Sequence, residues 1–249
     1  PGGAGTARHG HQRERKGDLD VDLDVKKNLQ WSLCVVTDRG LAGGRPLAEV
    51  VRAAIAGGAT LIQLREKEAG TREMLEVGES LLEVTRAAGV PLIVNDRVDV
   101  ALALGADGVH VGRDDMPAHI ARRLIGEGRL LGVTVGSVRE VLAAEAAGAD
   151  YLGTDAVFPT PTKPDAGPPL GLEGLREICR VARVPVLGIG GVNARNAAEL
   201  IRVGAAGVAV VSAVMAAPDV EAAARELRAV VESAAQERRD RHEQAQGSG

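Results

Sequence analysis

Eight short apolar segments recur along the chain, and this pattern limits the fold more than any other feature of the sequence. The segments begin at Leu33, Leu61, Pro91, Gly108, Leu130, Tyr151, Pro185 and Gly207. Longer stretches with the periodicity of amphipathic helices separate them, as from Arg72 to Ala88 and from Val138 to Ala147. Short strands that alternate with helices predict βαβ units and therefore a parallel sheet.

An internal repeat indicates how that sheet closes. A Gly-Ala pair precedes each even-numbered segment, whereas a Val-Pro pair precedes the third and the seventh. The pairs are Gly58-Ala59, Gly105-Ala106, Gly148-Ala149 and Gly204-Ala205, then Val90-Pro91 and Val184-Pro185. Glycine suits the end of a helix, and proline is tolerated at the first residue of a strand. A βαβα pattern that recurs four times predicts an α/β fold, the (β/α)8 TIM barrel. The alternative is an open, doubly wound sheet, but the loop that begins at Thr37 is not a dinucleotide-binding fingerprint.

Composition excludes several classes of partner. Aromatic residues make up 1% of the 249 residues, and the formal net charge is -4. Few aromatic platforms and no excess of positive charge argue against binding to nucleic acid or to an anionic membrane. No apolar run reaches the roughly 18 residues of a membrane-spanning helix. We therefore expect small molecules as partners, no nucleic acid, no membrane and a cytoplasmic location. The sequence leaves open whether the chain forms a homo-oligomer.

The two ends of the chain lack the alternating strand and helix pattern of its middle. Residues 1–28 mix Gly, Arg, Lys, Asp and His without periodicity, so we expect a disordered tail there. We assign residues 29–236 to the barrel catalytic domain and expect a second disordered tail at residues 237–249.

Polar residues that follow the second segment are the first candidates for a site, because function in such barrels lies at the C-terminal ends of the strands. Gln63, Arg65 and Lys67 share one face of the strand, while Leu64 faces the helices. An amide and two cations on one face suit a polyphosphate or another anion. The alternative is a solvated strand end with ion pairs to Glu66 and Glu68.

Two carboxylates follow the next two segments. Asp96 comes after the third segment, beside Asn95, and Asp115 comes after the fourth. Loops of neighbouring strands lie side by side, and Mg²⁺ commonly takes one or two carboxylates together with water and substrate phosphates. The sequence therefore predicts Mg²⁺ shared by Asp96 and Asp115, with helix N-caps as the alternative. We expect His110 to be a hydrogen-bonded, partly buried histidine, with a general base as its alternative role.

The later loops add further groups that suit phosphate. A proline-rich loop follows the sixth segment and carries Thr160, Thr162 and Lys163. A long, stiff loop in a compact barrel is commonly functional, often as a lid. Gly188–Gly191 follow the seventh segment and Val211-Ser212 the eighth, where many barrels bind phosphate. Two anion sites, one linked to a metal and one built from glycine loops, predict two phosphorylated substrates that meet across the barrel mouth.

These motifs, in this order, resemble the thiamine-phosphate synthase family from about Leu33 to about Val231. The matching motifs are Gln63-Leu-Arg-Glu-Lys67, Asn95-Asp96, Gly108-Val-His-Val-Gly112 with Asp115, Phe158-Pro-Thr-x-Thr-Lys163, Gly188-Ile-Gly-Gly191 and Val211-Ser212. The resemblance implies a magnesium-dependent transferase that joins hydroxymethylpyrimidine diphosphate to hydroxyethylthiazole phosphate. Pyrophosphate leaves, and the thiazole nitrogen captures the pyrimidine-methyl cation that remains.

The resemblance also implies roles for individual residues. It assigns the pyrimidine diphosphate to Gln63, Leu64, Arg65, Glu66, Lys67, Asn95, Thr134 and Lys163. It assigns the thiazole phosphate to Thr160, Pro161, Thr162, Gly191, Val211 and Ser212, and it assigns Mg²⁺ to Asp96 and Asp115. Arg65, Lys67 and Lys163 would act in catalysis, because they stabilise departing pyrophosphate more in the transition state than in the ground state.

Four positions depart from the family pattern. Arg113 stands where Gln is common, Gly136 where His is common, and Thr134 where Ser is frequent. Asp155 lies in a turn that is usually rich in glycine, and we expect its added carboxylate to repel phosphate.

Three other functions stay open at this point. They are a thiazole tautomerase-like barrel enzyme, a phosphosugar isomerase or aldolase, and a non-catalytic phospho-ligand-binding barrel. Gly136 lacks the imidazole that the tautomerase group uses, and Lys163 favours the synthase.

Overall fold

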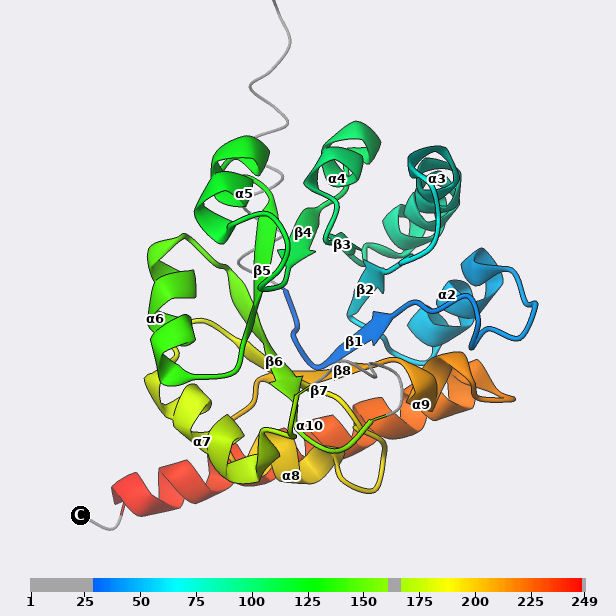
Figure 1. Cartoon of the computed structure of the whole chain (residues 1–249). Helices are drawn as coiled ribbons and strands as arrows, with labels where there is room; N and C mark the ends of the chain where they lie inside the picture. Colours follow the sequence, from blue (N-terminus) through cyan, green and yellow to red (C-terminus); the bar gives the residue numbers. More distant parts are fainter. Residues whose placement is uncertain (1–28, 161–166, 248–249) are drawn as a thin grey trace, which may run out of the picture.

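Eight parallel strands form one closed barrel in the computed structural model, which describes residues 29–160 and 167–247. Figure 1 shows the strands as an inner ring with helices around it. The strands are β1 (Leu33–Val36), β2 (Leu61–Leu64), β3 (Leu92–Asn95), β4 (Gly108–Val111), β5 (Leu130–Val135), β6 (Tyr151–Ala156), β7 (Val186–Ile189) and β8 (Gly207–Val210). Each strand pairs with the next, and β8 pairs with β1, where Leu33 lies opposite Val208. The predicted TIM barrel is confirmed, and residues 1–28 lie outside the described part of the chain.

A helix follows each of the first seven strands, and two helices follow the eighth. The helices are α2 (Leu47–Ala56), α3 (Thr71–Ala88), α4 (Val98–Leu104), α5 (Ala118–Ile125), α6 (Val138–Ala146), α7 (Gly171–Val181), α8 (Ala197–Arg202), α9 (Ser212–Met215) and α10 (Val220–Gly247). Gly105 ends α4 in the left-handed conformation, with φ 62°, which glycine adopts at little cost. This helix end gives one of the Gly-Ala pairs its physical reason. Among the described helices, none combines the length and the apolar character needed to cross a membrane.

The apolar residues of the strands divide into two clusters because successive side chains point to opposite faces. In β1, Leu33 and Val35 pack outward against the helices, whereas Cys34 and Val36 pack inside the barrel. The inner cluster consists of Cys34, Val36, Leu61, Ile93, Leu130, Tyr151, Leu187 and Ala209. Several of its members, such as Leu61 and Tyr151, are the first residues of their strands. These first residues fill the N-terminal end of the barrel, whereas Val36, the last residue of β1, extends the same cluster to the cavity lining, where polar side chains join it.

The last helix, α10, continues well beyond residue 236 and packs against α2, α8 and α9 (Figure 1). The expectation of a disordered tail at residues 237–249 is therefore wrong as far as Gly247, and residues 248–249 lie outside the described part of the chain. Arg238 donates to the backbone oxygens of Ile201 and Ala205 at 2.8 and 3.0 Å. Glu237 accepts a hydrogen bond from Arg202 Nη2 at 3.1 Å. These contacts hold the extra turns of α10 against α8.

Arg122 is a buried charge at the barrel end opposite the mouth. Only 8% of the residue is exposed, and its guanidinium donates to the backbone oxygens of Gly126, Arg129 and Gly148 at 2.6 to 3.1 Å. It also forms an ion pair with Asp150, the residue before β6. One side chain thus joins α5 to the segments that lead into β5 and β6.

We expect Arg122→Ala to lower the free energy of unfolding by about 2–4 kcal/mol, because it leaves three carbonyl oxygens and Asp150 without this donor. Urea unfolding at neutral pH measures the effect from the midpoint and slope. Arg123→Ala is the matched control, since Arg123 is exposed on the same helix; its effect should stay within about 0.5 kcal/mol. Equal stability of the two variants would contradict the role given to Arg122.

Candidate active site

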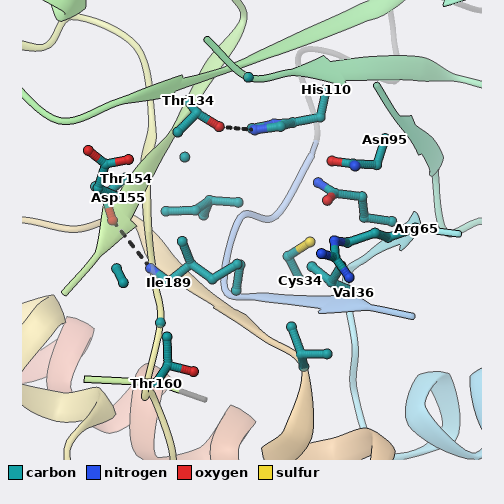
Figure 2. Close-up of a pocket in the computed structure, with 18 of the residues that line it drawn as sticks. Cys34, Val36, Arg65, Asn95, His110, Thr134, Thr154, Asp155, Thr160 and Ile189 are labelled. Carbon is teal, nitrogen blue, oxygen red and sulfur yellow. Dashed lines mark hydrogen bonds between the residues drawn. The ribbon is translucent and has the colours of Figure 1, made fainter. Parts of the chain in front are cut away.

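A cavity of about 530 Å³ lies at the C-terminal ends of the strands, as expected for function in a barrel. Most of the described residues that were predicted to form the site line this one cavity. They are Gln63, Arg65, Lys67, Asn95, Asp96, Asp115, Thr134, Thr160, Gly191, Val211 and Ser212. In Figure 2, Arg65 and Asn95 lie on one side of the cavity, and Thr154 and Asp155 lie on the opposite side.

The structure does not bring every predicted residue to the cavity. Leu64 is fully buried among the apolar residues between the barrel and the helices, because it points away from Gln63. Glu66 is not among the lining residues, and its carboxylate forms an ion pair with Arg39 at 3.3 Å. Pro161, Thr162 and Lys163 lie outside the described residues.

Two cations face the cavity from the loop after β2. The backbone N–H of Arg65 donates to the Thr37 hydroxyl at 3.0 Å, which ties this loop to the end of β1. The Arg65 guanidinium lies 4.0 Å from Asp38. Lys67 Nζ lies 3.5 Å from Asp96 Oδ2, and 53% of the Lys67 side chain is exposed. Both cations therefore keep loose contacts that an anionic ligand can replace.

Asp96 and Asp115 form a carboxylate pair beside these cations. The pKa of Asp96 is raised to about 6, first by burial and then by the hydrogen bond and negative charge of Asp115, while Lys67 opposes the shift. The backbone of Asp96 has φ 64°, a left-handed conformation that is uncommon for residues other than glycine. Neither aspartate caps a helix, because Arg97 and Pro117 occupy the N-caps of α4 and α5. The N-cap alternative is therefore wrong.

This carboxylate pair suits a divalent cation. Two adjacent carboxylates repel each other when both are ionised, and a shared cation removes that repulsion. The Gly112 N–H donates to Asp115 Oδ2 at 2.7 Å, which orients one of the two groups. Within residues 29–160 and 167–247, no group of three or more His, Cys, Asp or Glu side chains is arranged to hold a metal. Among the described residues, Asp96 and Asp115 are the pair that could hold such a cation.

Glycine and hydroxyl groups form the other side of the cavity. Gly190 and Gly191 follow β7 with φ 88° and 65°. A Cβ atom at Gly191 would lie 2.7 Å from the backbone oxygen of Pro159 and 2.8 Å from Phe158 Cβ. This close packing places the loop after β7 against the segment that carries Thr160. The absence of a side chain lets a ligand oxygen approach the backbone here.

A hydrogen-bonded chain of side chains forms the floor of the cavity. His110 is buried, and its Nδ1 and Nε2 atoms lie 3.0 Å from Tyr151 Oη and 2.9 Å from Thr134 Oγ1 (Figure 2 shows the contact with Thr134). Gly132 makes room for this arrangement, since a Cβ atom there would overlap both the Tyr151 ring and His110. The expected hydrogen bonding of His110 is confirmed, and the residue is more deeply buried than expected, with 8% exposed.

Two floor residues were not among the predicted site residues. Cys34 and Tyr151 line the cavity, and both point inward by the alternation of β1 and β6. The alternation of the strands could have predicted these two inward-facing positions. Because the neighbouring residues are apolar, the sequence pattern assigned both to the core instead. Burial raises the pKa of the Cys34 thiol to about 12, so it stays protonated at neutral pH and is not a nucleophile.

Comparison with known proteins agrees with this geometry. The family model described as thiamine monophosphate synthase matches residues 33–214. A thiamine-phosphate synthase of Roseiflexus sp. is 60% identical over 204 residues, which cover 82% of this chain and 86% of that protein. One of Chloroflexus aurantiacus is 59% identical over 209 residues, which cover 84% of this chain and 96% of that protein.

A solved structure agrees with these sequence relatives. Thiamine phosphate pyrophosphorylase from Pyrococcus furiosus superimposes with a TM-score of 0.76 at 48% sequence identity. The match covers 83% of this chain and 98% of that one. The chain is therefore an enzyme, a transferase, and it belongs to the thiamine monophosphate synthase family.

Proposed function

We propose that this member of the family condenses hydroxymethylpyrimidine diphosphate with hydroxyethylthiazole phosphate to give thiamine phosphate and pyrophosphate. The observation that carries the proposal is one cavity whose two sides differ, each with groups that suit an anion. Arg65, Lys67 and the carboxylate pair lie on one side, and Thr160 and the glycine loop after β7 on the other. Two anionic substrates can therefore meet between them.

The cationic side suits the diphosphate. As pyrophosphate departs it gains negative charge, and Arg65 and Lys67 stabilise that charge more strongly in the transition state than in the bound substrate. Gln63, Asn95 and Thr134 line the same cavity and would orient the pyrimidine substrate. Lys163, which lies outside the described residues, would add a third cation to the leaving group.

Asp96 and Asp115 would hold Mg²⁺, whose charge would partly neutralise the diphosphate. The raised pKa of Asp96 and its contact with Asp115 support this assignment, because a divalent cation stabilises two ionised carboxylates at close range. Lys67 contacts Asp96 at 3.5 Å, so it lies where it can bind both the carboxylate and a diphosphate oxygen.

Thr160, Gly191, Val211 and Ser212 would hold the thiazole phosphate. The hydroxyl of Thr160 and the backbone around Gly191 supply uncharged donors on the side opposite Arg65, as the position of Thr160 in Figure 2 illustrates. This separation directs the thiazole nitrogen toward the pyrimidine-methyl carbon. Pro161 and Thr162 belong to the same proposed set but lie outside the described residues.

The cavity offers little to the alternative functions. Gly136 has no imidazole for a tautomerase, and the buried Cys34 thiol has a pKa of about 12. Both ring nitrogens of His110 are hydrogen-bonded to protein side chains.

A turnover assay distinguishes an enzyme from a non-catalytic binder. The assay measures thiamine phosphate after its oxidation to fluorescent thiochrome. The two free cysteines support a cytoplasmic location.

Chelation of divalent cations is expected to abolish turnover, and added Mg²⁺ is expected to restore it. Asp96→Asn should lower kcat/KM by about a hundredfold or more, the size of effect seen when one electrostatic stabiliser is removed. The thiochrome assay measures both. Asp99→Asn is the matched control, because Asp99 is exposed at the start of α4 and pairs with Arg97. Full activity in chelator would remove the metal from the proposal.

Substitutions on the two sides of the cavity should affect the kinetic constants of different substrates. Gly191→Ala should raise KM for the thiazole phosphate by about tenfold or more, because a methyl group crowds Pro159 and Phe158 and displaces the backbone groups that would donate to the phosphate. Arg65→Ala should instead weaken the binding of the pyrimidine diphosphate and lower kcat. Steady-state kinetics with each substrate varied in turn measures the division.

Gly89→Ala is the control for the glycine substitution. Gly89 ends α3 with φ 65°, the same backbone conformation as Gly191, and nothing lies within 4 Å of a Cβ atom there. The control therefore carries the backbone strain without crowding the cavity. If Gly191→Ala and Arg65→Ala changed both KM values equally, a single-ligand site would explain the cavity better.

A further inference from the structure

Arg113, on the loop after β4, joins two carboxylates at the rim of the cavity. Its Nε and Nη2 atoms donate to Glu140 Oε1 and Oε2 at 2.7 and 3.0 Å. Its Nη1 and Nη2 atoms donate to Asp155 Oδ1 and Oδ2 at 2.9 and 2.5 Å. Glu140 lies in the first turn of α6 and Asp155 near the end of β6. We call Arg113, Glu140 and Asp155 the rim bridge, since one guanidinium links three successive βα units.

Gly136 provides the space that the rim bridge occupies. A Cβ atom at this position would overlap Asp155 Oδ2 and lie 2.5 Å from Arg113 Nη2. The Gly136 N–H also donates to Glu140 Oε2 at 2.6 Å. Any larger residue here would displace the guanidinium from Asp155. The rim bridge and the glycine therefore depend on each other.

The part of the rim bridge that faces the cavity is the ion pair between Arg113 and Asp155. Arg113 and Asp155 line the cavity, whereas Glu140 does not. The hydrogen bond from Arg113 is the largest of the effects that lower the pKa of Glu140 to about 2, and hydrogen bonds to both carboxylates raise the pKa of Arg113. If the guanidinium were removed, Asp155 would face the cavity with an uncompensated negative charge.

That charge lies on the side proposed for the phosphate of the thiazole substrate. Figure 2 shows Asp155 across the cavity from Arg65 and Asn95. Thr154, the preceding residue, accepts a hydrogen bond from the Ile189 N–H at 3.3 Å, which ties the end of β6 to the last residue of β7, just before the glycine loop. An unpaired carboxylate here would repel an incoming phosphate.

We propose that Arg113 is a positioning residue for the phosphate bound on the β6 to β8 side of the cavity. By holding Asp155 in a bidentate ion pair, it keeps that carboxylate from repelling the phosphate. The inference rests on the phosphorylated thiazole substrate of the proposed function. It also explains how a carboxylate can stand at the mouth of a cavity that receives two anions.

The test compares Arg113→Gln, Asp155→Asn and the double variant in steady-state kinetics. Arg113→Gln should raise KM for the thiazole phosphate by about tenfold, the effect of one uncompensated charge near the surface. It should change kcat and the KM for the diphosphate less. The increase should shrink at about 0.5 M salt, because salt screens exposed charges. Adding Asp155→Asn to Arg113→Gln should return KM toward the wild-type value.

Arg139→Gln is the matched control, because Arg139 is exposed beside Glu140 and does not line the cavity. Urea unfolding of each variant shows whether the fold is retained. Calorimetric titration with inorganic phosphate gives a second reading that needs no turnover. The affinity for phosphate should be lower in Arg113→Gln than in the wild type, and it should recover in the double variant.

Two results would overturn the inference. One is an unchanged KM and phosphate affinity in Arg113→Gln. The other is a loss in Arg113→Gln that neither salt nor Asp155→Asn relieves, which would make the rim bridge a packing element alone. An inactive wild-type enzyme would instead count against the proposed function, and the phosphate titrations would still decide the role of Arg113.

Discussion

Every second residue of each strand points into the barrel, and the rest of the structure depends on this alternation. It places Cys34 inside and Val35 outside, and it separates the inner cluster from the larger core beneath the helices. The same alternation carries Gln63 and Arg65 to the cavity while Leu64 stays among apolar neighbours. A one-residue shift in register would exchange these faces, so the core and the active site rest on the same geometry.

Local patterns predicted most of the fold, and long-range contacts explain what they missed. The apolar segments and the Gly-Ala pairs report local helix ends and strand starts, so sequence reasoning found all eight strands. The last turns of α10 are held by Arg238 through backbone oxygens more than thirty residues away, at Ile201 and Ala205. A carbonyl acceptor leaves no trace in the side-chain pattern. The periodicity of α10 therefore could not show where the helix ends.

The candidate site shows the same division. Strand ends and family motifs were enough to place Asp96 and Asp115 together, yet they predicted that Asp155 would repel phosphate. The structure pairs Asp155 with Arg113, from a different βα unit, in the space left by Gly136. Read one at a time, each of these three residues was only a departure from a pattern. Their relation becomes visible only when the barrel brings the loops side by side.

The inner cluster also provides a built-in optical probe. The chain has one tryptophan and one tyrosine, and the structure places them in contact, with the rings of Trp31 and Tyr151 5.0 Å apart. Tyr151 in turn contacts His110 beneath the cavity. Indole emission from this protein therefore comes from a single position at the closed end of the barrel. Without any added label, its intensity and wavelength report whether the barrel interior is assembled.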